Sequence, residues 1–101
     1  MIDNINHENL SQNLNTLFRT NIGPDQYVEL ELTEVSDVKL FSSHEQFSII
    51  FHGPAESFLG QGTRLFAHHD LGEFELFVVP VGRDAQGFLY QAVFNRVSKL
   101  S

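Results

Sequence analysis

The hydrophobic pattern of the chain changes its period near residue 25. Before that point, within residues 7–19, apolar residues follow the i, i+4, i+7, i+8 spacing of an amphipathic helix, at Leu10, Leu14, Leu17 and Phe18. Asn6 can cap the start of this helix, and Gly23-Pro24 is predicted to end it. The asparagines within the segment are poor helix formers, so the helix should depend on packing for its stability.

After residue 25 apolar and polar residues alternate, which is typical of half-buried β-strands. The segment 26–35 shows the alternation most clearly, with Val28, Leu30 and Leu32 set against glutamates and a threonine. Glycine and proline divide the rest into runs of similar length. Five strands are therefore predicted, at residues 26–35, 46–53, 60–68, 72–81 and 87–97.

Together these segments predict a mainly β fold, a small antiparallel barrel or sandwich of five to six strands with one N-terminal amphipathic helix. Residues 1–101 should form a single domain, with a helix and lead-in at 1–22 and a β-domain at 25–97. Gly53-Pro54 and the glycines near residue 60 should form corners, where glycine supplies a positive φ angle or a bulge.

The predicted strand 72–81 is apolar on both of its faces. Such a strand needs a cover on each side. We expect the N-terminal helix to cover the second face, which includes Ile50, Phe77 and Val79. The alternative cover is another subunit.

The alternation also predicts the core and one strand register. Pairing Phe74 with Phe94 and Leu76 with Ala92 keeps the large apolar residues on one face and leaves residues 81–87 as the loop. The predicted core consists of Phe47, Ile49, Phe51, Leu76, Val78, Tyr90, Ala92 and Phe94. In the strand at 63–68 either Leu65 or Phe66 can point inward, and the larger apolar area favours Phe66.

Charge and composition exclude several classes of function. The formal net charge is −7, and residues 1–50 alone hold eight acids and two bases. A nucleic-acid partner is not expected because no basic stripe is present, and an anionic membrane surface is disfavoured for the same reason. The chain has no cysteine, which excludes thiolate metal sites and cysteine nucleophiles.

The chain shows neither an N-terminal signal pattern nor an apolar run that could span a membrane. It is therefore expected to be cytoplasmic, or exported without a cleaved signal peptide as part of an assembly.

Several short motifs resemble those of a family of small bacterial proteins described only as a domain of unknown function. The motifs are Phe47-Ser-Ile-Ile-Phe-His-Gly-Pro54, Gln61-Gly-Thr63, His68, Leu71-Gly72, Leu76-Phe-Val-Val-Pro-Val81 and Tyr90-Gln-Ala-Val-Phe-Asn95. The resemblance spans about residues 25–96 and excludes the predicted helix. It implies an association with tail-collar or phage-tail-like proteins and brings no catalytic residue. Arg64 stands where the family pattern has tyrosine.

Histidines and carboxylates offer the only hints of a metal site. His68, His69 and Asp70 are consecutive, and imidazole and carboxylate groups bind zinc. Side chains of adjacent strand residues point in opposite directions, so the three could bind one ion only from a turn, with a further ligand such as His52. The simpler interpretation is a polar turn in which His68 bonds to the backbone, and no cofactor is predicted.

No other catalytic constellation stands out. Glu29 with Glu31, and Glu73 with Glu75, could converge only if their strands were neighbours, and like charges in that position would destabilise the sheet. The sequence also lacks a nucleophile elbow and a P-loop.

Three functions follow from these observations. The first is a non-enzymatic structural or interaction module, an accessory to a tail-like or other multiprotein assembly, with a protein partner or self-association. The second is a small-ligand or glycan-binding barrel whose open end includes Tyr27, Arg64, Tyr90 and the histidines. The third is a metal-dependent hydrolase. A partner surface could also include Leu10, Leu14 and Phe18 of the helix.

Overall fold

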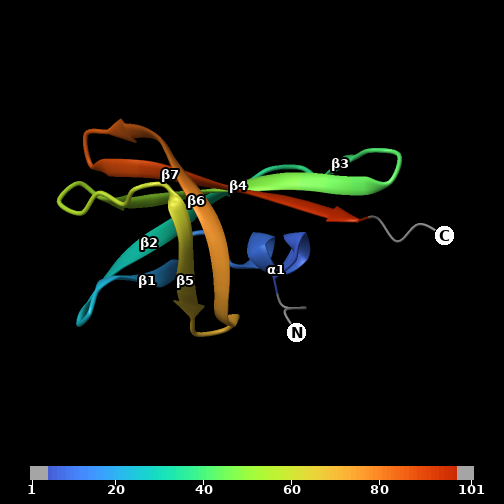
Figure 1. Cartoon of the computed structure of the whole chain (residues 1–101). Helices are drawn as coiled ribbons and strands as arrows, with labels where there is room; N and C mark the ends of the chain where they lie inside the picture. Colours follow the sequence, from blue (N-terminus) through green and yellow to red (C-terminus); the bar gives the residue numbers. More distant parts are fainter. Residues whose placement is uncertain (1–4, 98–101) are drawn as a thin grey trace.

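The computed structural model describes residues 5–97, which fold into an antiparallel β-barrel with one short helix (Figure 1). The barrel has six strands in the order β2-β1-β5-β6-β7-β4, and pairing of β2 with β4 closes the ring. The short β3 extends the sheet beyond β4. The prediction of a mainly β antiparallel barrel is confirmed. The elements are α1 (His7–Gln12), β1 (Leu17–Gly23), β2 (Gln26–Val35), β3 (Lys39–Leu40), β4 (His44–Pro54), β5 (Gly62–His68), β6 (Gly72–Asp84) and β7 (Gly87–Val97).

In strands such as β2 and β4 apolar residues occupy every second position, and this face of the strand is buried in the barrel. On β5, Phe66 is buried and Leu65 is exposed, as predicted from their apolar areas. The rings of Phe51, Phe66 and Phe74 stack, with centroid distances of 5.3 and 6.1 Å. Phe18 packs edge-on against this stack.

Side chains from every barrel strand fill the interior. Of the eight predicted core residues, seven are buried, and the eighth, Phe94, is partly buried and stacks on Phe47 at a centroid distance of 4.7 Å. The buried apolar cluster comprises Ile5, Leu10, Phe18, Val28, Leu30, Leu32, Phe47, Ile49, Phe51, Leu59, Phe66, Leu71, Phe74, Leu76, Val78, Tyr90 and Ala92.

The predicted pairs Phe74–Phe94 and Leu76–Ala92 do not form, because β6 and β7 pair only from Val79 and Gln91 to Asp84 and Gly87. The predicted register of this hairpin is also wrong by two residues. Val79 lies opposite Gln91 and Pro80 opposite Tyr90, with a register shift between Pro80 and Gly82. The predicted loop 81–87 is instead mostly strand, because β6 continues to Asp84 and β7 begins at Gly87. An offset of two leaves every side chain on its predicted face, so the hydrophobic pattern could not reveal the error.

The predicted helix 7–19 is wrong beyond Gln12. Asn13 caps the helix, and Asn15 adopts a positive φ of 66°, a conformation that asparagine tolerates. The backbone N–H of Asn15 then donates to the carbonyl of Leu32, so the chain runs along β2 and becomes β1. The β1–β2 turn therefore lies at Pro24-Asp25, directly after Gly23, and residues 17–22 belong to the barrel and not to a lead-in.

The position of α1 corrects a second expectation. The helix lies at one end of the barrel, below β4 and β7 in Figure 1, and does not cover the outer face of β6. Leu10 is buried in the core, and the His7 ring packs edge-on against Phe47. Phe77 consequently remains 52% exposed. Within residues 5–97 no helix has the length and apolar character required to cross a membrane.

The connection 55–61 crosses the opposite end of the barrel from β4 to β5. Its Leu59 is buried, and the Leu59 N–H donates to the hydroxyl of Tyr90 at 2.9 Å. Gly53 lies within β4, and its φ angle is not positive, so the predicted corner at this position is wrong. Close packing favours glycine there, because a Cβ would lie 2.5 Å from Leu30 Cδ2 and 3.1 Å from Tyr90 Cε2, and both of these side chains are buried.

Candidate functional site

The turn between β5 and β6 contains His68 and His69, the pair considered as candidate metal ligands in the sequence. His68 ends β5 and is buried, whereas His69 and Asp70 are exposed in the turn. Gly72 follows with a φ of 81°, which glycine adopts without strain, and starts β6. The His69 ring stacks on the His68 ring at a centroid distance of 4.7 Å.

Both ring nitrogens of His68 have hydrogen-bond partners. The backbone N–H groups of Asp70 and Leu71 donate to Nδ1 at 3.0 and 3.3 Å. Nε2 lies 2.9 Å from Thr16 Oγ1, and that hydroxyl donates to the carbonyl of Asn13. Nδ1 must therefore be unprotonated, while Nε2 carries the proton and donates it to Thr16.

This environment favours the neutral imidazole. Burial lowers the pKa of His68 below 6.5, the nearby His69 lowers it further, and Asp70 opposes the shift only in part. The two backbone N–H donors at Nδ1 confirm the expected hydrogen bonding of His68 to the backbone near the hairpin end.

The geometry makes His68-His69-Asp70 a poor metal site. Each residue offers one ligand atom, and these atoms lie within 4.8 Å of one another. A metal ion could bind His68 only by displacing Thr16 or the two backbone donors. His52, the proposed additional ligand, is not part of this group and instead pairs with Asp84 at 3.1 Å.

His52 and Asp84 connect β4 to the β6–β7 hairpin. Oδ1 of Asp84 accepts from His52 Nε2 and from the backbone N–H groups of Gln86 and Gly87. These donors, chiefly His52, hold the pKa of the Asp84 carboxyl below its usual value. The arrangement is that of a stabilised hairpin turn.

The two glutamate pairs lie on strands that are not neighbours, β2 and β6. Between them Arg19 of β1 lies opposite Glu29 in register, and its guanidinium is 4.0 Å from the Glu29 carboxylate. The same guanidinium covers the ring of Tyr27, 4.2 Å from its centroid. An open groove of about 530 Å³ lies beside these residues, lined by Leu17, Arg19, Glu29, Ala67, His68, His69, Gly72 and Glu73.

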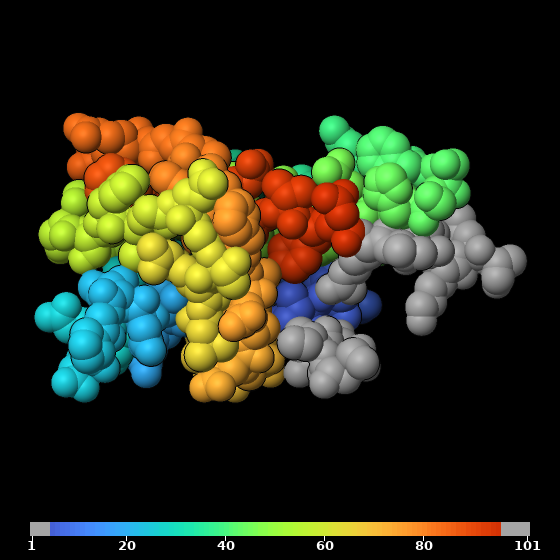
Figure 2. Space-filling view, viewed as in Figure 1, coloured from blue at the N-terminus to red at the C-terminus, as the bar shows by residue number. Residues whose placement is uncertain are grey.

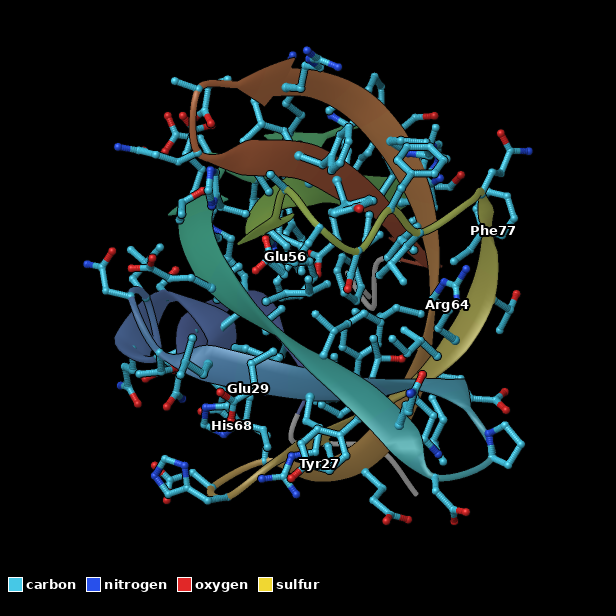
Figure 3. All side chains as sticks on the ribbon, turned by 90° about the vertical axis from the view of Figure 1, so that its left-hand side faces the viewer. Tyr27, Glu29, Glu56, Arg64, His68 and Phe77 are labelled. Atoms are coloured by element: carbon cyan, nitrogen blue, oxygen red, sulfur yellow. The ribbon has the colours of Figure 1, made fainter. Side chains whose placement is uncertain are left out.

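The residues expected at an open barrel end do not come together. Figure 3 views the molecule along the barrel, with Arg64 directed inside and Tyr27 on the wall. Tyr90 is buried in the core, and its hydroxyl is used by Leu59. Arg64 Nη2 donates to the carbonyl of Gly60 at 3.1 Å, while its buried Nε has no partner within the described residues.

The helix residues proposed as a partner surface are mostly inaccessible. Leu10 and Phe18 are buried in the core, and only Leu14 is partly accessible, with 37% exposure. Accessible apolar residues lie instead on the barrel wall. Leu65 and Phe77 are 47% and 52% exposed on the outer faces of β5 and β6. For Phe77 the signal was the apolar second face of residues 72–81, which we expected the helix to cover. The exposure of Leu65 agrees with the prediction that Phe66 points inward.

These features define a small closed β-barrel with a filled interior and accessible apolar residues on its wall. The chain belongs to the family whose model is described as Domain of unknown function (DUF6916), which matches residues 5–94. The match begins at residue 5 and so includes α1 and β1, which the sequence resemblance left out. No curated protein and no solved structure matches the chain.

Proposed function

We propose that this protein is a non-enzymatic interaction module that binds a protein partner through an outer apolar patch formed by Leu65, Phe77 and Val79. Thr63 lies opposite Phe77 and Leu65 opposite Glu75, so Leu65 and Phe77 are diagonal neighbours on adjacent strands. Val79 follows Phe77 on the same face of β6 and is partly buried. Adjacent apolar side chains that remain about half exposed on one strand face support a protein contact there, because contiguous exposed apolar surface marks such sites.

The surroundings of the patch suggest the chemistry of the partner. Glu73 and Glu75 lie beside it on the same outer face of β6, and both are exposed. A partner surface with an apolar centre and a basic rim would complement this arrangement. Neither a nucleic acid nor a membrane fits an acidic chain with a net charge of −7.

The cellular setting belongs to the same proposal. The resemblance of the sequence motifs to proteins associated with tail-collar or phage-tail-like proteins favours an accessory role in a multiprotein assembly. Such a role is compatible with a cytoplasmic location, or with export without a cleaved signal peptide as part of the assembly.

A glycan or other small ligand is the second candidate. The groove beside Arg19, Glu29 and Glu73 favours it, because it combines charged groups with an apolar floor. Support is weaker than for the patch, since the barrel interior is filled and Tyr90 is buried. A metal-dependent hydrolase has less support again, because both ring nitrogens of His68 are engaged. Titration with oligosaccharides, followed by amide chemical shifts around Arg19, tests the ligand hypothesis.

The interaction hypothesis is tested by site-specific photocrosslinking in the native host. A benzoylphenylalanine replaces Phe77, and the matched control replaces Tyr27, an exposed aromatic residue on the outer face of β2. We expect a discrete protein adduct from position 77 and none from position 27. The adduct should disappear when Leu65→Glu is added, because a charge then enters the patch. Equal labelling from both positions, or no adduct at position 77, would contradict the proposal.

A further inference from the structure

β6 and β7 separate partway along the barrel wall. Their pairing runs from Asp84 and Gly87 as far as Val79 and Gln91. Beyond this point residues 92–97 of β7 pair with β4 on one side, and within residues 5–97 no strand pairs with the other side. Figure 1 shows β6 turning away while β7 continues beside β4. This open edge of β7, residues 92–97, presents backbone groups that another strand can pair with.

The diverging part of β6 also has one open side, but its charge is different. Residues 72–78 of β6 carry Glu73 and Glu75, and charged side chains on an edge discourage a further strand. Residues 87–97 of β7 contain no acid and one base, Arg96, in a chain whose net charge is −7. The open edge of β7 therefore lacks the repulsion that opposes close approach over most of this acidic surface.

We propose that a second copy of this chain adds to the open edge of β7, with the two β7 strands antiparallel across a two-fold axis. Two copies with the same negative charge repel each other except where acids are absent, so charge directs self-contact to this edge. This inference goes beyond the proposed function, since it names the occupant of a surface separate from the outer apolar patch.

The side chains of the edge suit such a pairing. Residues that face each other across antiparallel strands share a face, so an axis near Phe94 places Phe94 next to its counterpart. Each Phe94 already stacks on Phe47, and the pairing would extend the aromatic row through both copies. On the outer face Val93, which is 50% exposed, would lie near Asn95 of the second copy.

The contact joins the β3-β4-β7 ribbons of two copies into one continuous sheet. Figure 2 shows β7, in red, on the surface between β6 in orange and the β3–β4 end in green. One strand edge covers less area than a standard protein interface, so the dimer should depend on concentration.

Sedimentation velocity of the full chain from micromolar to millimolar concentration tests the proposal. We expect a reversible monomer–dimer equilibrium. Val93→Glu should weaken it about 10-fold or more, because it sets like charges across the axis. Leu65→Glu is the matched control, since it adds the same charge at a similarly exposed strand position away from the edge and should leave the dimer intact. A monomer at every concentration, or equal weakening by both variants, would overturn the proposal.

Crosslinking provides a readout that does not depend on the stability of the charged variants. The chain has no cysteine, so Asn95→Cys introduces a single thiol beside the open edge. A short bis-maleimide should link two Asn95→Cys chains but not two Asn21→Cys chains, in which the thiol is on the exposed outer face of β1. Linking at position 21, or none at position 95, would show that the copies meet elsewhere or not at all. Loss of the position 77 adduct with an intact dimer would instead refute only the proposed function.

Discussion

Thr16 and His68 are 52 residues apart in the chain, yet Thr16 Oγ1 and His68 Nε2 lie 2.9 Å apart. The bond ties the start of β1 to the β5–β6 turn, where His68 also accepts two backbone N–H groups. Within the described residues, β1 and β5 pair at two positions, Arg19 with Ala67 and Thr20 with Phe66. The hydrogen bond between Thr16 and His68 therefore reinforces a part of the barrel wall that has few backbone pairs.

Acidification should destabilise the protein through His68. The pKa of His68 in the fold is below 6.5, so the unfolded chain binds more protons once the pH falls below that value. The stabilisation is complete above about pH 6.5 and is lost progressively as the pH falls toward the folded pKa. The melting temperature should therefore be lower at mildly acidic pH than at neutral pH, and thermal melts at the two pH values measure the difference.

Two variants separate this effect from general acid sensitivity. His68→Gln should lower the neutral-pH melting temperature and reduce its dependence on pH. His69→Gln removes an exposed imidazole and should retain most of that dependence. An unchanged pH profile in His68→Gln would show that another group is responsible.

Gly87→Ala should strongly destabilise the barrel. A Cβ at Gly87 would collide with the carbonyl oxygen of Gly53 on the paired strand β4. Relief requires the β4 and β7 backbones to move apart, which should cost about 1–3 kcal/mol or more. Gly60→Ala is the control, because a Cβ there has no neighbour within 4 Å. Urea denaturation measures both variants, and equal stability would disprove the close approach.

Truncation of Leu10 tests whether α1 is part of the fold. Leu10 is fully buried in the core, so Leu10→Ala should cost about 2–5 kcal/mol of unfolding free energy. Leu14→Ala removes a side chain that is 37% exposed and should cost much less. A small effect at Leu10 would mean that the helix detaches freely from the barrel.

Tyr90→Phe should loosen the connection 55–61 more than the barrel. The substitution leaves the buried Leu59 N–H without its acceptor, which should cost about 1–3 kcal/mol. Hydrogen exchange at Leu59 should accelerate, with little change at the centre of β4. Tyr27→Phe serves as the control, because Tyr27 is exposed. Unaltered exchange at Leu59 would argue against the hydroxyl as its acceptor.

Sequence periodicity predicted the strands in which apolar residues alternate with polar residues. It also placed Phe66 inward and seven core residues correctly, because burial favours the larger apolar side chain. It missed β1, in which the inward position after Phe18 is Thr20, a polar residue whose hydroxyl donates to the carbonyl of Leu65. Without a second apolar inward residue, the spacing from Leu10 to Phe18 imitated a helix.

The candidate sites were harder to predict because they depend on contacts between distant segments. Consecutive histidines suggested a metal, but the partner that occupies His68 Nε2 is Thr16, far away in the chain. The position of α1 could not be read from its sequence either. Its buried face suits any apolar surface, and the pattern gave no reason to prefer the barrel end over the outer face of β6.

The filled interior has a consequence for how this family can diversify. Inward and outward residues alternate along each strand, so residues such as Phe66 hold the barrel together while neighbours such as Leu65 contribute little to it. Substitutions at the outward positions can therefore change the surface offered to other molecules at small thermodynamic cost. Evolution can draw many different binding specificities from one scaffold of this kind, and a protein engineer can use the same freedom.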